Sequence, residues 1–287
     1  MKVVLFCGGM GMRLRDYDEN VPKPMVPIGY RPILWHVMKY YAHFGHKDFI
    51  LCLGHRADAI KNYFRNYDEC VSNDFVLSDG GRRLELLHSD IGDWRITLVD
   101  TGINANIGQR LKAVEPYLAG EAEFFANYSD GLTDLPLPAQ LDHFRRQDVS
   151  ASFLCVRPQL SCHFVVAQHD GQVTSVQDVE QTGLRINGGF FIFRAAIFDY
   201  LRRGEDLVMD AFQQLLDRNQ LLAYCYDGFW QSMDTFRDKQ RLDDLYARGE
   251  APWVVWQRPG PATVRAASDA GPPIPLPHAR RGALRSG

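Results

Sequence analysis

Short apolar runs alternate with helical patterns over the first 67 residues, and this alternation most constrains the fold. Residues 3–7 and 48–53 are apolar runs bounded by glycine, which is typical of buried strands. Residues 33–44 and 57–67 place large apolar side chains at helical spacing. Strands that alternate with helices indicate parallel pairing across helical connections. We therefore predict an α/β domain with a parallel sheet.

The rest of the chain continues this pattern with one β-rich excursion. In residues 75–99, the runs RLELLH and RITLVD flank the turn-rich SDIGD, which predicts a β-hairpin. A second hairpin is predicted around HDG, with strands at 164–168 and 172–176. Further strands are predicted at 123–128, 150–156 and 187–193, and further helices at 111–118, 137–147, 209–219 and 237–248.

The composition changes after residue 256. Residues 257–287 hold six prolines, several arginines and few large apolar side chains. Such a segment cannot bury enough surface to offset its ordering entropy. We expect residues 1–256 to be the folded domain and residues 257–287 to be a disordered Pro/Arg-rich tail.

Bulk charge and cysteine usage exclude several classes of protein. The net charge is -3, so no global basic field draws the chain to nucleic acid or to an acidic membrane. No apolar stretch approaches the roughly 18 residues of a membrane span. The six cysteines form no CxxC pair, and three of them lie in strand-like runs. We therefore expect a reducing, cytoplasmic setting without disulfides.

The stretch CGGMGMR follows the first predicted strand, and PKP follows it ten residues later. Gly8, Gly9 and Gly11 let backbone N–H groups approach phosphate oxygens. Arg13 adds a bidentate donor, and Lys23 adds a point charge between two prolines. The spacing fits neither a Walker A loop nor a dinucleotide fingerprint, which argues against a dehydrogenase. A plain strand–loop turn remains the simpler alternative.

Three further stretches carry polar groups at predicted strand ends. Asp130 in YSDG follows a buried strand, and Asp234 in QSMDTFRD follows an aromatic run; together they could share one Mg²⁺. Alternatively, Asp130 is a turn residue and Asp234 starts the next helix. INGGFF offers Asn187 and two glycines to a polyhydroxyl ligand, or is a bulged strand start.

These stretches, in order, resemble the sugar-1-phosphate nucleotidyltransferases, and within them the cytidylyltransferase branch. The resemblance rests on GGMGMRL, PKPM, IGYRPILWHVMKYY, YSDG, INGGFF and FWQSMDTFRDK, and it covers about residues 1–256. It implies a Rossmann-like mixed, mostly parallel sheet flanked by helices. It also implies Mg²⁺-dependent attack of a sugar-1-phosphate on the α-phosphorus of CTP or another nucleoside triphosphate, and a homo-oligomer.

The resemblance also implies roles for individual residues. Arg13 and Lys23 would be catalytic, and Asp130 and Asp234 would hold the metal. The matches for nucleotide binding are Gly8, Gly9, Met10, Gly11, Met12 and Arg110, and those for the sugar phosphate are Tyr128, Asp178, Asn187 and Gly188.

The chain departs from the family pattern at positions that are expected to select the nucleotide base and the sugar phosphate. Met12 replaces the usual threonine of the loop, and Ile107 and Gln109 replace a hydroxyl residue and a glycine near the base. Asp178 and Val179 stand for a glutamate and for the lysine that grips the sugar phosphate. Arg185 and Arg157 are candidates to supply the missing charge. The alternative to an active transferase is a catalytically weakened module that binds nucleotides or sugar nucleotides.

Overall fold

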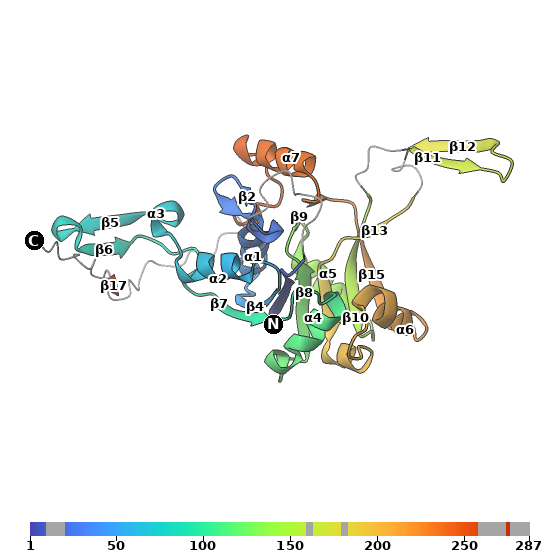
Figure 1. Ribbon diagram of the computed structural model, residues 1–287, viewed down its shortest axis with the longest axis horizontal. Helices are drawn as coiled ribbons and strands as arrows, with labels where there is room; N and C mark the ends of the chain where they lie inside the picture. The colour runs from blue at the N-terminus through green and yellow to red at the C-terminus, as the bar shows by residue number, and fades with distance from the viewer. Residues whose placement is uncertain (10–20, 159–162, 179–182, 258–273, 276–287) are drawn as a thin grey trace, which may run out of the picture.

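A mixed eight-stranded sheet organises the molecule (Figure 1). The computed structural model describes residues 1–9, 21–158, 163–178, 183–257 and 274–275. In spatial order seven of the strands are β7 (Arg95–Asp100), β4 (Asp48–Leu53), β1 (Val3–Phe6), β8 (Glu123–Tyr128), β14 (Phe191–Arg194), β10 (Ala151–Val156) and β15 (Leu221–Tyr226). The eighth, β13 (Ile186–Asn187), also pairs with β10. β7, β4, β1 and β8 pair in parallel, and β14 runs antiparallel to both neighbours. The predicted α/β fold is confirmed.

Helices cover both faces of the sheet. Successive residues of a strand point to opposite sides, and in β1 both sides are apolar, so each face needs a covering layer. Val3 and Leu5 face a core built with α1 (Ile33–His43), α2 (Ala57–Arg65), α5 (Leu137–Arg145) and α7 (Phe236–Ala247). Val4 and Phe6 face a second core built with α4 (Ile107–Val114), the η4 turn (Glu115–Leu118), the η6 turn (Ala195–Asp199), the π-helical turn η7 (Leu207–Ala211) and α6 (Phe212–Leu216). β1 is therefore buried on both faces, as its apolar run predicted.

Two hairpins project from opposite ends of the molecule (Figure 1). One pairs β11 (His163–Ala167) with β12 (Val173–Asp178), as predicted. The other pairs β5 (Phe75–Ser78) with β6 (Arg83–Leu86) through the η3 turn (Asp79–Gly81), next to α3 (Glu69–Ser72).

Arg31 ties the β5–β6 end to the body of the domain. Its guanidinium, 3% exposed, pairs with Asp90 at 2.6 Å and donates to the Ser72 hydroxyl and carbonyl oxygens at 2.9 and 2.8 Å. It also donates to the Tyr67 hydroxyl.

Short elements complete the connections. β2 (Pro27–Ile28) pairs with β3 (Arg31–Pro32), and β9 (Gly131–Thr133) pairs with β16 (Trp230–Ser232). The η2 turn (Lys23–Met25) precedes β2, and the η8 turn (Val255–Gln257) packs against α1. Most of the expected tail lies outside the described residues; within it, β17 (Ile274–Pro275) pairs with β6. No helix in the described ranges is long and apolar enough to cross a membrane.

The predicted hairpin around SDIGD is wrong. The RLELLH run pairs with the preceding strand β5, whereas RITLVD forms β7 and joins the main sheet parallel to β4. All six β7 residues are in register with β4, from Asp48↔Arg95 to Leu53↔Asp100, so β7 extends the edge of the main sheet. β15 was not predicted at all.

The single strand predicted at residues 187–193 is also wrong. Two short strands, β13 (Ile186–Asn187) and β14, pair in succession along one edge of β10. Between them Gly189 has φ 77° and Phe190 has φ 47°, so the chain bulges out of the ladder. The bulge that the sequence offered as one interpretation of INGGFF is therefore present, while a ligand-facing role of Asn187 stays a prediction.

Candidate active site

A lysine lies between two aspartates at the ends of the strands. Lys23 Nζ lies 2.5 Å from Asp130 Oδ2 and 2.8 Å from Asp234 Oδ1. The three residues are more than 100 positions apart in the sequence, and the fold brings them together. Asp130 follows β8, at the carboxyl edge of the parallel strands, where α/β folds present ligand-binding groups.

Local hydrogen bonds fix each member of this cluster. The Met233 N–H donates to the Asp130 carbonyl at 2.9 Å, which joins the two carboxylate-bearing turns. The Ser232 hydroxyl donates to Asp234 Oδ2 at 2.8 Å. Lys23 sits at the start of η2, where Pro22 and Pro24 restrict the backbone. The cluster is therefore held by three separate turns.

Asp234 is not the cap of the following helix. Thr235 is the N-cap of α7 and forms a capping box with Asp238. Asp238 Oδ2 also accepts from the Asp234 N–H at 3.1 Å, so the helix start and the Asp234 turn form one unit. The Asp234 carboxylate instead accepts hydrogen bonds from Lys23 and Ser232.

The lysine is charged in this setting. Burial alone would lower the pKa of Lys23, but attraction from Asp130 and hydrogen bonds to both carboxylates outweigh it, and the pKa is raised. The cluster therefore combines one fixed positive charge with two carboxylates beside a cavity.

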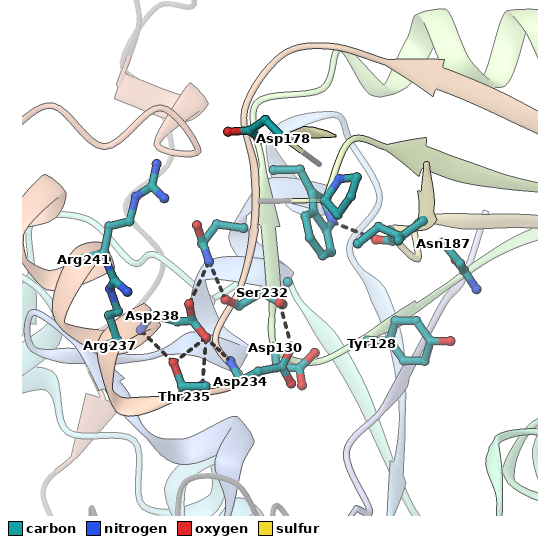
Figure 2. Close-up of a pocket in the computed structure, with 16 residues that line it drawn as sticks. Tyr128, Asp130, Asp178, Asn187, Ser232, Asp234, Thr235, Arg237, Asp238 and Arg241 are labelled. Atoms are coloured by element: carbon teal, nitrogen blue, oxygen red, sulfur yellow. Dashed lines mark hydrogen bonds between the residues drawn. The ribbon is translucent and has the colours of Figure 1, made fainter. Parts of the chain in front are cut away.

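The cavity has a volume of about 1120 Å³ and opens beside the two aspartates (Figure 2). In Figure 2, Tyr128 and Asn187 lie on one side and Arg237 and Arg241 on the other. The described lining residues are Tyr128, Asp130, Gly131, Pro158, Asp178, Ile186, Asn187, Gly188, Trp230, Gln231, Ser232, Asp234, Thr235, Arg237, Asp238 and Arg241. All four residues matched to the sugar phosphate are therefore in its lining.

The bulge between β13 and β14 shapes one wall of this cavity. Trp230 Nε1 donates to the Gly188 carbonyl at 2.8 Å, and Asn187 Oδ1 accepts from the Gly189 N–H at 2.9 Å. The amide orientation of Asn187 is thus fixed by its own turn. Burial, together with the negative charge of Asp130, raises the pKa of Tyr128 to about 12, so its hydroxyl stays protonated. The wall presents an amide, a phenol and an indole, which suits a polyhydroxyl ligand.

Arg110 does not line the cavity; it braces the strand ends. Its guanidinium is 2% exposed and donates to the Leu53 and Gly8 carbonyls at 3.0 and 2.8 Å and to Thr101 Oγ1 at 2.7 Å. A Cβ on Gly8 would lie 2.0 Å from Arg110 Nη1. Gly8 is therefore needed here for the close approach of a side chain.

The remaining loop residues are placed as follows. Gly9 is exposed, with open space around it. Met10, Gly11, Met12 and Arg13 lie outside the described residues, as does Val179. Ile107 opens α4, and Gln109 closes a capping box with Asn106, so both belong to the start of that helix.

The two arginines expected to replace the missing lysine are engaged elsewhere. Arg185 and Arg157 both pair with Asp227 Oδ1, at 2.8 and 3.0 Å, and neither lines the cavity. The cavity instead has Arg237 and Arg241, which sequence reasoning missed. Their spacing of four residues on a predicted helix was the signal that could have revealed them.

Comparisons with known proteins fit this geometry. The model of the family described as nucleotidyl transferase matches residues 2–238. Glucose-1-phosphate cytidylyltransferases of Salmonella typhi and Salmonella typhimurium are each 38% identical over 259 residues, covering 90% of this chain and 100% of theirs. A mannose-1-phosphate guanyltransferase of Yarrowia lipolytica is 23% identical, over 83% of this chain and 62% of its own length.

Solved structures share the fold at lower identity. A UDP-glucose pyrophosphorylase complexed with UDP-glucose superposes with a TM-score of 0.63 and 15% identity, covering 86% of this chain and 98% of that one. HddC from Yersinia pseudotuberculosis gives 0.60 and 19%, covering 85% and 99%.

These matches and the site define an enzyme class. The chain belongs to the nucleotidyl transferase family, and its resemblance to the sugar-1-phosphate nucleotidyltransferases is confirmed. Among the relatives that cover nearly the whole chain, the two Salmonella proteins are glucose-1-phosphate cytidylyltransferases.

Proposed function

We propose that this enzyme joins CTP and glucose-1-phosphate to give CDP-glucose and pyrophosphate. The observation that carries this proposal is the position of Lys23, which lies between Asp130 and Asp234 beside a cavity with a polar, aromatic wall. The choice of CTP and glucose-1-phosphate is supported by the Salmonella relatives, which match along their whole length.

The chemistry requires charge neutralisation more than covalent catalysis. A phosphate oxygen of the sugar-1-phosphate attacks the α-phosphorus of CTP, and the bond from that phosphorus to pyrophosphate breaks. Both reactants are anionic, so their approach depends on fixed positive charge. Lys23 supplies such a charge at the cluster, and positioning of the two reactants supplies much of the remaining acceleration.

We further propose that Asp130 and Asp234 hold Mg²⁺. Their oxygens converge on one point, since both lie within hydrogen-bond reach of the same ammonium group. Two carboxylates suit Mg²⁺, which completes its shell with phosphate and water oxygens. No larger group of His, Cys, Asp and Glu side chains that could hold a metal occurs among the described residues. When bound, Mg²⁺ would neutralise phosphate charge.

The two substrates would occupy different parts of the site. Tyr128, Asn187 and Gly188 would face the sugar, and Asp178, which also lines the cavity, would contact its polar groups. The stretch from Gly8 to Arg13 would hold the triphosphate, with Arg13 over the leaving pyrophosphate. The geometry of Arg110 supports an indirect role at the Gly8 end of this stretch.

Turnover is favoured over the alternative of a binding module without activity. The substitution at Val179 argues for weakened catalysis, because it removes a lysine expected from the family pattern. The convergence of Lys23, Asp130 and Asp234 argues for turnover, since a binding module has no need of that arrangement.

We also propose a cytoplasmic homo-oligomer whose catalytic domain spans residues 1–256. Exposed apolar side chains on the projecting hairpins support subunit contacts; they are Val76, Leu77, Phe164, Val165, Val166, Val173 and Val176. Free thiols at all five cysteines of the described chain support a reducing compartment. Light scattering of the purified protein tests the oligomer, and a monomer at micromolar concentration would refute it.

The activity test uses substrate pairs. The enzyme is incubated with Mg²⁺, each of ATP, CTP, GTP, UTP or dTTP, and a panel of sugar-1-phosphates, and pyrophosphate release is measured. We expect the highest kcat/KM with CTP and glucose-1-phosphate. A higher value for another pair would refute the substrate assignment, and no release with any pair would refute the reaction.

A further inference from the structure

We propose that Arg237 and Arg241 form the cationic subsite that binds the phosphate group of the sugar substrate. This inference rests on the proposed function and goes beyond it, because it assigns specificity to two residues of α7. Both guanidinium-bearing residues line the cavity next to Asp234 and Thr235 (Figure 2).

The acidic lining of the cavity means that an anionic substrate needs cationic side chains in order to bind there. Asp130, Asp178, Asp234 and Asp238 all line it, so the wall is strongly acidic. A sugar-1-phosphate carries nearly two negative charges, and it needs cations to enter. Among the described lining residues, Arg237 and Arg241 are the ones that carry positive charge. Lys23 is already engaged by two carboxylates.

Neither arginine is neutralised within the described part of the chain. Both are exposed, and neither has a hydrogen bond or ion pair to a described residue. The nearby Asp238 is instead engaged by the backbone N–H groups of Asp234 and Thr235 and by Gln231. Arg248, just beyond the end of α7, by contrast lies 3.0 Å from Glu250. The cavity therefore faces two guanidinium groups with unused donors.

Helix α7 places Arg237 and Arg241 on the same face. Residues four apart lie on the same face of a helix, so Arg237 and Arg241 project together. The start of α7 is tied to the Asp234 turn by Asp238, which fixes the pair relative to the catalytic carboxylates. Planar guanidinium groups also match phosphate oxygens in bidentate geometry.

The cavity wall identifies the ligand as the sugar phosphate. Tyr128, Asn187 and Trp230 line the same cavity, and such aromatic and amide groups recognise hydroxyl-rich ligands. Gly8 and Gly9, the described part of the loop assigned to the triphosphate, are not among its lining residues. The arginines therefore serve the acceptor half of the site.

Steady-state kinetics test the assignment. Arg237→Gln, Arg241→Gln and the double variant are compared with Arg146→Gln, a control at an exposed arginine that follows α5 and does not line the cavity. Glucose-1-phosphate is varied at saturating CTP, and then CTP is varied at saturating glucose-1-phosphate. We expect the double variant to raise the KM for glucose-1-phosphate at least about tenfold, the range of one lost charge-assisted contact, with the KM for CTP changed less than about twofold. The control should match the wild type.

The outcomes separate this inference from the proposed function. A rise in the KM for CTP alone would mean that the two arginines bind the triphosphate. No change in either KM would mean that they contact only solvent and bind neither substrate. Either result refutes the inference. If the wild type releases no pyrophosphate, the proposed function fails. Calorimetric titration with glucose-1-phosphate then decides: the double variant must bind at least about tenfold more weakly. Equal binding, or none by the wild type, refutes the subsite.

Discussion

Replacing Lys23 by methionine tests whether this lysine serves as the counter-ion of the two aspartates. Asp130 and Asp234 oxygens lie 2.5 and 2.8 Å from the same nitrogen. They are therefore about 5 Å apart at most, where two unit charges repel by ~1 kcal/mol in water and ~3 kcal/mol at an effective dielectric constant of 20. The carboxylate side chains are 24% and 38% exposed, so the repulsion lies between these limits.

The expected cost of Lys23→Met without divalent metal is about 1–2 kcal/mol, equivalent to a fall of about 3–6 °C in Tm for a domain of this size. Millimolar MgCl₂ should reverse most of this loss, because a cation then returns between the carboxylates. The kcat should nevertheless fall by about 10²–10³, since positive charge is lost where phosphate charge develops.

Thermal melts in EDTA and in MgCl₂ measure both effects. Lys47→Met is the control: its exposed pair with Asp93 should contribute under about 1 kcal/mol and should not respond to Mg²⁺. If Lys23→Met melts at the wild-type temperature in EDTA, or if Mg²⁺ leaves its Tm unchanged, the lysine does not neutralise the two aspartates.

Three further substitutions probe the metal site, the brace and a buried histidine. Asp130→Asn should reduce kcat at least about 10²-fold in a protein that still folds cooperatively, and surviving activity would remove Asp130 from the site; exposed Asp142→Asn is its control. Gly8→Ala should lower the free energy of urea unfolding by about 1–3 kcal/mol, since its Cβ would meet Arg110 at 2.0 Å; an unchanged midpoint would refute this clash. Burial lowers the pKa of His36 from 6.5 to about 4, so the stability that depends on its neutral form is complete above pH 6.5 and is lost as the pH falls toward 4. Between pH 7 and 5 the loss is about 2 kcal/mol, and His36→Gln should remove it; equal slopes in the two proteins would refute the assignment.

Local patterns explain how much of the fold was predictable. β1 and β4 are short apolar runs that are buried on both faces, and α1 has regular helical spacing, so sequence alone places them. The pairing of β7 was predicted wrongly because strand pairing is non-local. Its alternating sequence is compatible with a hairpin, yet its partner β4 ends 42 residues earlier, at Leu53. The break between β13 and β14 depends on backbone angles at Gly189 and Phe190 that composition does not specify.

The site was predictable to the extent that its residues occupy strand ends. Asp130 and Lys23 were placed by motif order, and the structure brings them within 2.5 Å. Arg110 shows the limit of such reasoning, because an arginine near a glycine loop reads equally well as a ligand-binding group or as a brace. Its direction is set by the carbonyl oxygens of Gly8 and Leu53, which only the folded chain brings together. Arg237 and Arg241 were not predicted as site residues, because charged side chains on one face of a helix usually indicate that this face is exposed to solvent.

The contact between Arg110 and the strand ends has an evolutionary consequence. A Cβ at Gly8 or at Gly54 would fall 2.0 or 2.8 Å from the same Arg110 nitrogen, so three positions that are distant in the sequence share one volume. Each glycine can acquire a side chain only in a lineage that has first shortened the arginine, and a shortened arginine leaves a gap that favours a larger neighbour. Gly8, Gly54 and Arg110 should therefore change together or not at all among descendants of this gene.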